Sequence, residues 1–127
     1  MGNTKSSPGE QVYSAVKNNQ PGQVRDLCSH AARHARPDAI RYVDKQGRTA
    51  LALACYKNYH QCAHALLEAG AEVGFQDTTG VGFGDSALHE AAKGKHEAIC
   101  ELLLCYGANP FVCNIQGRTA MDEAQDA

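Results

Sequence analysis

The stretch SALHEAAKGKHEAICELLLCYGANP, residues 86–110, decides the fold because similar segments recur on both sides of it. Shifted back by 37 residues, it aligns with TALALACYKNYHQCAHALLEAGAEV, residues 49–73; shifted forward by 33, it meets Thr119 at the start of a third copy. A period near 33, with Thr-x-Leu early in the unit and Leu-Leu-x-x-Gly-Ala late in it, predicts a helical solenoid. In each unit a hydroxyl caps an inner helix, and a leucine-rich outer helix packs back on it.

The period divides the chain into an arm and four units. Residues 1–9 have no apolar periodicity and form the arm, and residues 10–42 read as a degenerate first repeat. Full repeats follow at 43–75 and 76–113, and 114–127 begins a repeat that has no segment for its outer helix. An unsealed end exposes apolar surface, so we expect the chain to be the amino-terminal part of a longer protein.

These motifs resemble ankyrin repeats. The opening Thr-Pro-Leu-His of that family stands here as Thr49-Ala50-Leu51-Ala52, Ser86-Ala87-Leu88-His89 and Thr119-Ala120-Met121-Asp122. Alanine replaces the proline in all three copies, which removes the preset φ of the first helical position. The resemblance implies an all-α ankyrin solenoid, in which His89 braces hydrogen bonds between repeats.

The composition excludes several other classes. With 127 residues, 43% apolar and 20% charged, the chain can fold around a core, and its net charge of −2 disfavours nucleic-acid binding. No apolar run approaches the length that spans a bilayer, and the polar first 20 residues lack a secretory signal. A cytoplasmic, reducing location is therefore expected, with the six cysteines as thiols.

The arm fits the Met-Gly-x-x-x-Ser pattern of N-myristoylation, with Gly2 as the acceptor and Ser6 as the required hydroxyl residue. A chance match is the alternative. One myristoyl chain gives only weak, reversible attachment, so the prediction is peripheral contact with the cytoplasmic face of a membrane.

No pattern of a reaction centre, metal site or cofactor site is present. His60 and His64 share one helix face, but Cys62 between them points elsewhere and aligns with the core position Ile99. We therefore expect no metal and no cofactor. The four cysteines that fall on apolar repeat positions are predicted to be small core residues: Cys28, Cys55, Cys62 and Cys100.

The function that remains for the stacked repeats is binding of a partner through their hairpin tips and inner helices. Tyr56, flanked by Arg48 and Lys57, is the best candidate anchor, because tyrosine and arginine dominate interface hot spots. The face leans basic, which favours an acidic peptide, although each side chain could equally be solvated surface and Phe83 could fold back on a helix. The predicted partner-binding residues are Lys45, Gln46, Arg48, Tyr56, Lys57, Phe83, Glu90, Lys93, Ile115, Gln116 and Arg118.

A Met-Gly arm leading into ankyrin repeats resembles the plant membrane-associated ankyrin-RING ubiquitin ligases. The matching stretches are the arm, the run from Gly47 to Cys55, the extended hairpin with Ser86 to Lys93, and Tyr106 to Pro110. The resemblance implies a substrate-recruiting, membrane-tethering arm that is not itself an enzyme, because this chain contains no RING. The competing interpretation is a free-standing ankyrin adaptor or inhibitor without any link to ubiquitin.

Overall fold

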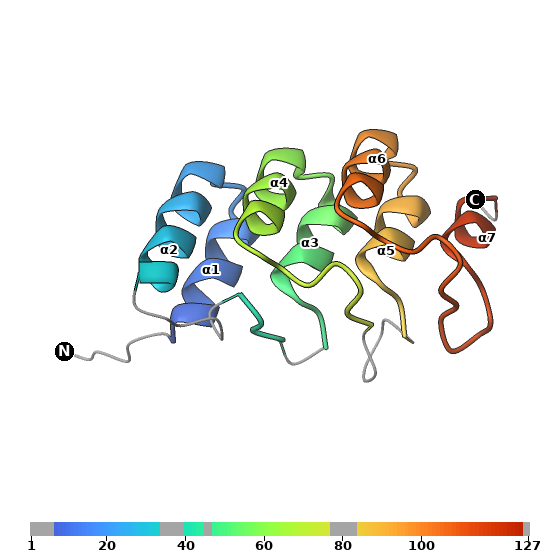
Figure 1. Cartoon of the computed structure of the whole chain (residues 1–127), viewed down its shortest axis with the longest axis horizontal. Coiled ribbons are helices and arrows are strands. Elements are labelled where there is room, and N and C mark those ends of the chain that lie inside the picture. Colours follow the sequence, from blue (N-terminus) through green and yellow to red (C-terminus); the bar gives the residue numbers. More distant parts are fainter. Residues whose placement is uncertain (1–6, 34–39, 45–46, 77–83, 126–127) are drawn as a thin grey trace.

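The computed structural model describes residues 7–33, 40–44, 47–76 and 84–125, and these contain seven α-helices and no β-strand. The helices form two rows, with α1, α3, α5 and α7 in the inner row and α2, α4 and α6 in the outer row (Figure 1). The predicted all-α solenoid is therefore confirmed. The helices are α1 (Pro8–Lys17), α2 (Pro21–Arg33), α3 (Ala50–Lys57), α4 (His60–Glu68), α5 (Ala87–Lys93), α6 (Glu97–Cys105) and α7 (Ala120–Gln125).

Hydroxyl side chains start the inner helices, as the sequence predicts. The Thr49 hydroxyl accepts a hydrogen bond from the backbone N–H of Ala52 at 3.1 Å at the start of α3. Ser86 does the same for His89 at the start of α5, and the His89 ring reaches back to the Ser86 backbone N–H. Each cap satisfies N–H groups that have no partner within the helix.

The turns between inner and outer helices share one backbone geometry. Asn19, Asn58 and Lys95 adopt left-handed conformations, with φ of 55°, 63° and 58°. The next residue then donates its backbone N–H to a carbonyl of the preceding inner helix, as Tyr59 does to Ala54 at 2.8 Å. The helix pairs therefore repeat with the same reversal of direction.

The outer helices α4 and α6 end at glycines in the left-handed region, Gly70 and Gly107, with φ of 97° and 93°. The residue after each glycine donates its N–H back into the helix, from Ala71 to Leu66 and from Ala108 to Leu103, at 3.0 Å in both cases. A side chain at either glycine would be strained, which explains the Gly-Ala ending of both full repeats.

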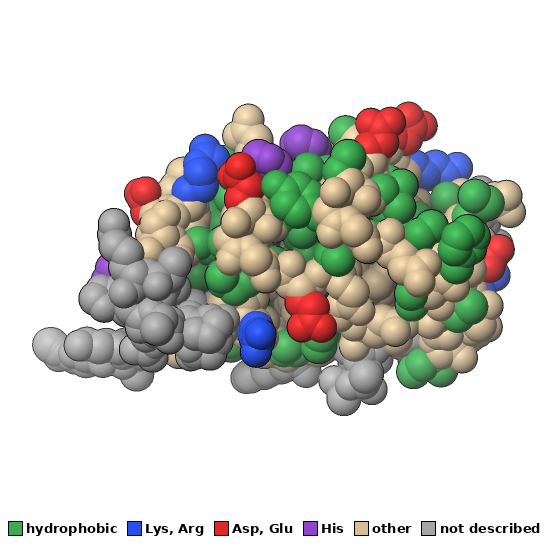
Figure 2. All heavy atoms as spheres, viewed as in Figure 1, with side chains coloured by type: hydrophobic (Ala, Val, Ile, Leu, Met, Phe, Trp, Pro, Cys, Tyr) green, Lys and Arg blue, Asp and Glu red, His purple; other side chains and the backbone are tan. Residues whose placement is uncertain are grey.

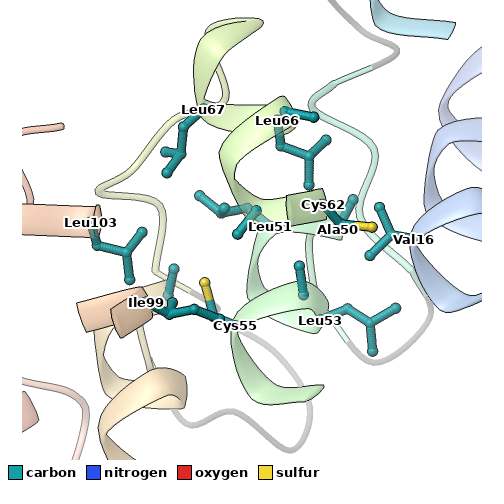
Figure 3. Close-up of a cluster of buried hydrophobic side chains, with 14 of the residues drawn as sticks. Val16, Ala50, Leu51, Leu53, Cys55, Cys62, Leu66, Leu67, Ile99 and Leu103 are labelled. Carbon is teal, nitrogen blue, oxygen red and sulfur yellow. The ribbon is translucent and has the colours of Figure 1, made fainter. Parts of the chain in front are cut away.

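The core lies between the two rows of helices, where aliphatic side chains of neighbouring repeats meet (Figure 3). Leu66, Ile99 and Leu103 have no exposed surface. The prediction that cysteines are core residues is confirmed for Cys28, Cys55 and Cys62, whereas Cys100 is only partly buried. Burial raises the pKa of these four thiols, which disfavours the reactive thiolate.

The last described helix, α7, belongs to the inner row. In the described part of the chain α7 packs on α5, and no outer helix follows it. Leu104 is 45% exposed and Met121 is 68% exposed. Figure 2 shows apolar side chains gathered toward this end of the molecule. Among the described residues, α6 and α7 therefore each leave an apolar side chain largely exposed.

Candidate protein-interaction surface

Tyr56 stands near the end of α3 with 45% of its surface exposed. The guanidinium of Arg48 lies over its ring, 4.7 Å from the centroid, in a cation–π contact. The backbone carbonyl of Tyr56 accepts a hydrogen bond of 3.2 Å from Nε2 of His96, at the start of α6. Both ends of the residue are thus held, and the ring remains accessible.

Arg48 also pairs with the next repeat. Its Nε lies 3.8 Å from a carboxylate oxygen of Glu90 on α5, close enough for an ion pair but too long for a hydrogen bond. Glu90 is only 3% exposed. The expectation that Glu90 lies on the open face is therefore wrong, because its carboxylate is buried between repeats against the Arg48 cation.

Lys93 at the end of α5 pairs with the buried Asp85, whose side chain is 1% exposed. Although burial lowers the pKa of Lys93, the hydrogen bond and charge of Asp85 raise it above its ordinary value. The other carboxylate oxygen of Asp85 accepts a hydrogen bond of 2.9 Å from Asn114 in the following hairpin turn. Asp85 thus links two repeats and neutralises Lys93.

The third hairpin turn is organised by the same asparagine. The side-chain oxygen of Asn114 accepts from the backbone N–H groups of Gln116 and Arg118, each at 3.0 Å. Its amide nitrogen donates to Glu123 at 2.8 Å, and the Arg118 Nε lies 3.5 Å from that same carboxylate. Within this turn Ile115 is 68% exposed.

The structure brings several predicted contact residues to this surface and leaves others untested. Tyr56, Lys57, Lys93, Ile115 and Gln116 are exposed, and Arg48 and Arg118 are partly so. The three cations Arg48, Lys93 and Arg118 each face a carboxylate, so the surface is less basic than the sequence implied. The remaining predicted residues lie outside the described part of the chain: Gly2, Lys45, Gln46 and Phe83.

Two groups of this surface were not predicted, Asp85 and Asn114. Asp85 immediately precedes the cap residue Ser86, and Asn114 occupies the position of Asp44 in the matching turn. Asp44 accepts the backbone N–H of Arg48 at 2.9 Å and the hydroxyl of Tyr13. Matching the turns residue by residue would have identified Asn114 as a brace between repeats, whereas Asp85 aligns with Arg48 and Arg118 and has no such signal.

His64, His89 and His96 have structural partners. His89, 1% exposed, bonds through Nε2 to the Arg118 carbonyl at 2.9 Å, which confirms its predicted role between repeats. His64 lies 3.7 Å from Glu68 and makes an edge contact with the ring of Tyr106. Among the described residues no three potential metal ligands come together. The helices of this part of the chain also lack the length and apolar character that a bilayer span requires.

Comparisons with known proteins agree with this geometry. The putative E3 ubiquitin-protein ligase XBAT34 of Arabidopsis thaliana is 35% identical over 99% of this chain, and the probable E3 ubiquitin-protein ligase XBOS34 of Oryza sativa subsp. japonica is 32% identical over 96%. The NF-kappa-B inhibitor epsilon of Homo sapiens is 34% identical over 77%. The chain spans 32%, 22% and 20% of the lengths of these three relatives.

Family models match nearly the whole solenoid. The model described as ankyrin repeats in three copies matches residues 9–77, more than half of the chain, and a single ankyrin repeat matches residues 83–115. Both matches follow the helix pairs described above, with their capped inner helices and glycine-terminated outer helices. The chain therefore belongs to the ankyrin-repeat family.

Proposed function

We propose that this chain is the substrate-recruiting arm of a RING-type ubiquitin ligase and that Tyr56 anchors the recruited protein. The observation that supports this most is the exposed Tyr56 ring, held against Arg48 at the junction of two repeats. The similarity of nearly the whole chain to two relatives named as E3 ubiquitin-protein ligases supports the link to ubiquitin. Ubiquitin transfer would belong to another part of the protein.

The partner is expected to be a protein segment that covers Tyr56 and the exposed turn residue Ile115. That this segment is acidic remains a prediction from the sequence. Because Arg48, Lys93 and Arg118 already face carboxylates, the aromatic ring rather than net charge is the principal anchor.

Replacing Tyr56 with alanine is expected to weaken binding of the recruited protein by about thirtyfold, the effect of losing an interface hot spot of about 2 kcal/mol. A photo-crosslinking amino acid in place of the neighbouring exposed Lys57, which leaves Tyr56 intact, first identifies the partner. Titration calorimetry then compares wild type with Y56A. The control variant is Gln23→Ala, on the exposed face of α2. Equal losses of affinity in Y56A and Gln23→Ala, or no loss in Y56A, would show that Tyr56 is not the anchor.

The second candidate is an adaptor or inhibitor that covers its partner without ubiquitin, favoured by the similarity to NF-kappa-B inhibitor epsilon. The two candidates differ in the fate of the crosslinked partner. Recruitment to a ligase predicts that ubiquitin-modified partner falls in cells when Y56A replaces the wild type. Unchanged ubiquitin modification, with the partner's own activity released, supports the inhibitor.

We further propose that Gly2 is myristoylated and tethers the protein weakly to the cytoplasmic face of a membrane. The support is the sequence pattern of the arm. Mass spectrometry of the mature N-terminus is expected to find a mass increase of one myristoyl group on Gly2, absent in Gly2→Ala. A free or acetylated Gly2 would disprove the tether and leave the proposal about recruitment intact.

A further inference from the structure

The turns that join inner to outer helices lie along one edge of the molecule, opposite the hairpins (Figure 1). Their shared hydrogen bond puts the repeats in register. In each turn one backbone N–H donates to the carbonyl five residues earlier, at 2.8–3.0 Å, and the donors are Gln20, Tyr59 and His96. The residues three positions before these donors are Lys17, Tyr56 and Lys93. Tyr56 therefore has a lysine at the equivalent place in the repeat before it and in the repeat after it.

Each of the three turns also carries an exposed lysine that forms no ion pair with the described residues. We call these the lysine row: Lys17 at the end of α1, Lys57 at the end of α3 and Lys95 between α5 and α6. The cations of the Tyr56 surface outside this row each face a carboxylate, namely Arg48, Lys93 and Arg118. The positive charge that is left for a ligand is thus concentrated along the edge formed by the turns.

Exposed carboxylates do not interrupt the lysine row. The last turns of α1, α3 and α5 contain none, because Glu10 stands in the first turn of α1 and Glu90 is buried. In the described part of the chain the exposed carboxylates near this edge stand on the outer helices: Asp26 on α2, Glu68 on α4, and Glu97 and Glu101 on α6. A ligand along the inner-helix ends would therefore meet cations, which makes an acidic ligand complementary.

The chemistry of this edge favours an extended chain over a helix. The exposed neighbours of Tyr56 are polar, namely Asn18, Lys57 and Asn58, whereas a bound helix needs an apolar groove. Packed helices lie roughly 8–10 Å apart. An extended chain advances about 3.3 Å per residue, so about three residues of the ligand span one repeat.

We infer that the segment recruited through Tyr56 is extended and acidic, with one acidic side chain facing Lys17 and another facing Lys95. These two lie about three residues to either side of an apolar residue that covers Tyr56. The inference rests on the proposed function for its anchor and adds the charge and the spacing of the partner.

Three end-capped heptapeptides test the spacing and the charge. The acidic probe is Glu-Ser-Ser-Leu-Ser-Ser-Glu, and the neutral probe has glutamine in place of both glutamates. The shifted probe, Ser-Glu-Ser-Leu-Ser-Glu-Ser, keeps the charge but moves each glutamate one residue inward. In NMR titrations of the isotope-labelled chain at low salt, the acidic probe is expected to shift amide signals in the last turns of α1, α3 and α5. It is expected to bind about fivefold more tightly than the neutral probe and about threefold more tightly than the shifted one, differences that shrink with salt.

Variants of the protein locate the two ion pairs. Lys17→Gln and Lys95→Asn are each expected to reduce the preference for the acidic over the neutral probe about twofold, since each removes one exposed ion pair. Asparagine suits position 95 because Asn19 and Asn58 hold the equivalent left-handed place. The matched control is Arg25→Gln, which removes an exposed cation from the outer helix α2 and is expected to leave the preference unchanged.

Tyr56→Ala separates failure of this inference from failure of the proposed function. Weaker binding of the recruited protein in Tyr56→Ala, together with equal affinity of the wild type for the acidic and neutral probes, would overturn the acidic segment and leave the anchor in place. No effect of Tyr56→Ala on the recruited protein would instead overturn the proposed function. Equal affinity for the acidic and shifted probes, or the same reduction in Arg25→Gln as in Lys17→Gln, would show only diffuse charge attraction and would also overturn the inference.

Discussion

Replacing Leu103 with alanine is expected to lower the free energy of unfolding by about 2–5 kcal/mol. Leu103 has no exposed surface and lies in the core cluster with Ile99 and Cys55, where α6 meets its neighbours (Figure 3). Truncation removes the transfer free energy of the leucine side chain and leaves a cavity that short helices on both sides can close only in part. Urea unfolding followed by circular dichroism measures the loss.

The adjacent leucine is the matched control for this variant. Leu104→Ala removes the same atoms from the same helix, but Leu104 is 45% exposed. Its effect on the free energy of unfolding is expected to stay within about 0.5 kcal/mol. Similar losses for the two variants would mean that the core does not lie on the Leu103 side of α6.

Replacing His89 with alanine is expected to cost about 1–3 kcal/mol, because the buried Ser86 N–H loses its partner. The Arg118 carbonyl loses one of two hydrogen bonds and keeps the one from the Asn114 N–H at 2.9 Å. The Ser86 N–H donates to Nδ1 of His89, which leaves Nε2 to carry the proton and donate to the Arg118 carbonyl at 2.9 Å. One ring therefore caps its own helix and holds the next repeat. Urea unfolding gives the loss, and hydrogen exchange is expected to show reduced protection in α7.

His89→Gln separates the two roles of this residue. Glutamine at the third helical position can reach back to the Ser86 N–H and restore the capping box. The glutamine side chain is shorter than the distance that the imidazole ring spans between Ser86 and Arg118. The hydrogen bond to the Arg118 carbonyl is therefore expected to stay lost. Partial recovery of stability, with α7 still poorly protected, supports both roles; full protection of α7 in either variant would contradict the bond between repeats.

The sequence predicted the fold because each repeat signals its own boundaries. Hydroxyl caps such as Thr49 and Ser86, and the glycines Gly70 and Gly107, act within a few residues of where they stand. Repetition at 37 and 33 residues then fixed how the units stack. The local signals at the helix ends and the repeat period together were sufficient to predict the helices and how the repeats stack.

The interaction surface was predicted less well, because exposure depends on the neighbouring repeat. Glu90 was expected on the exposed face from its place in the repeat pattern, yet it aligns with Leu53, which is buried in the preceding repeat. The buried carboxylate is tolerated because Arg48, 42 residues earlier, supplies the opposite charge. Pairs so distant in sequence carry no local signal.

The identical left-handed turns at Asn19, Asn58 and Lys95 have a consequence for long ligands. Because the chain reverses direction in the same way in each repeat, equivalent side chains lie at near-constant intervals along the molecule. An extended chain that engages one interval is already positioned for the next, and each later contact forms at high effective concentration. Selectivity for such a ligand would then reside in the spacing of its anchors as much as in their chemistry.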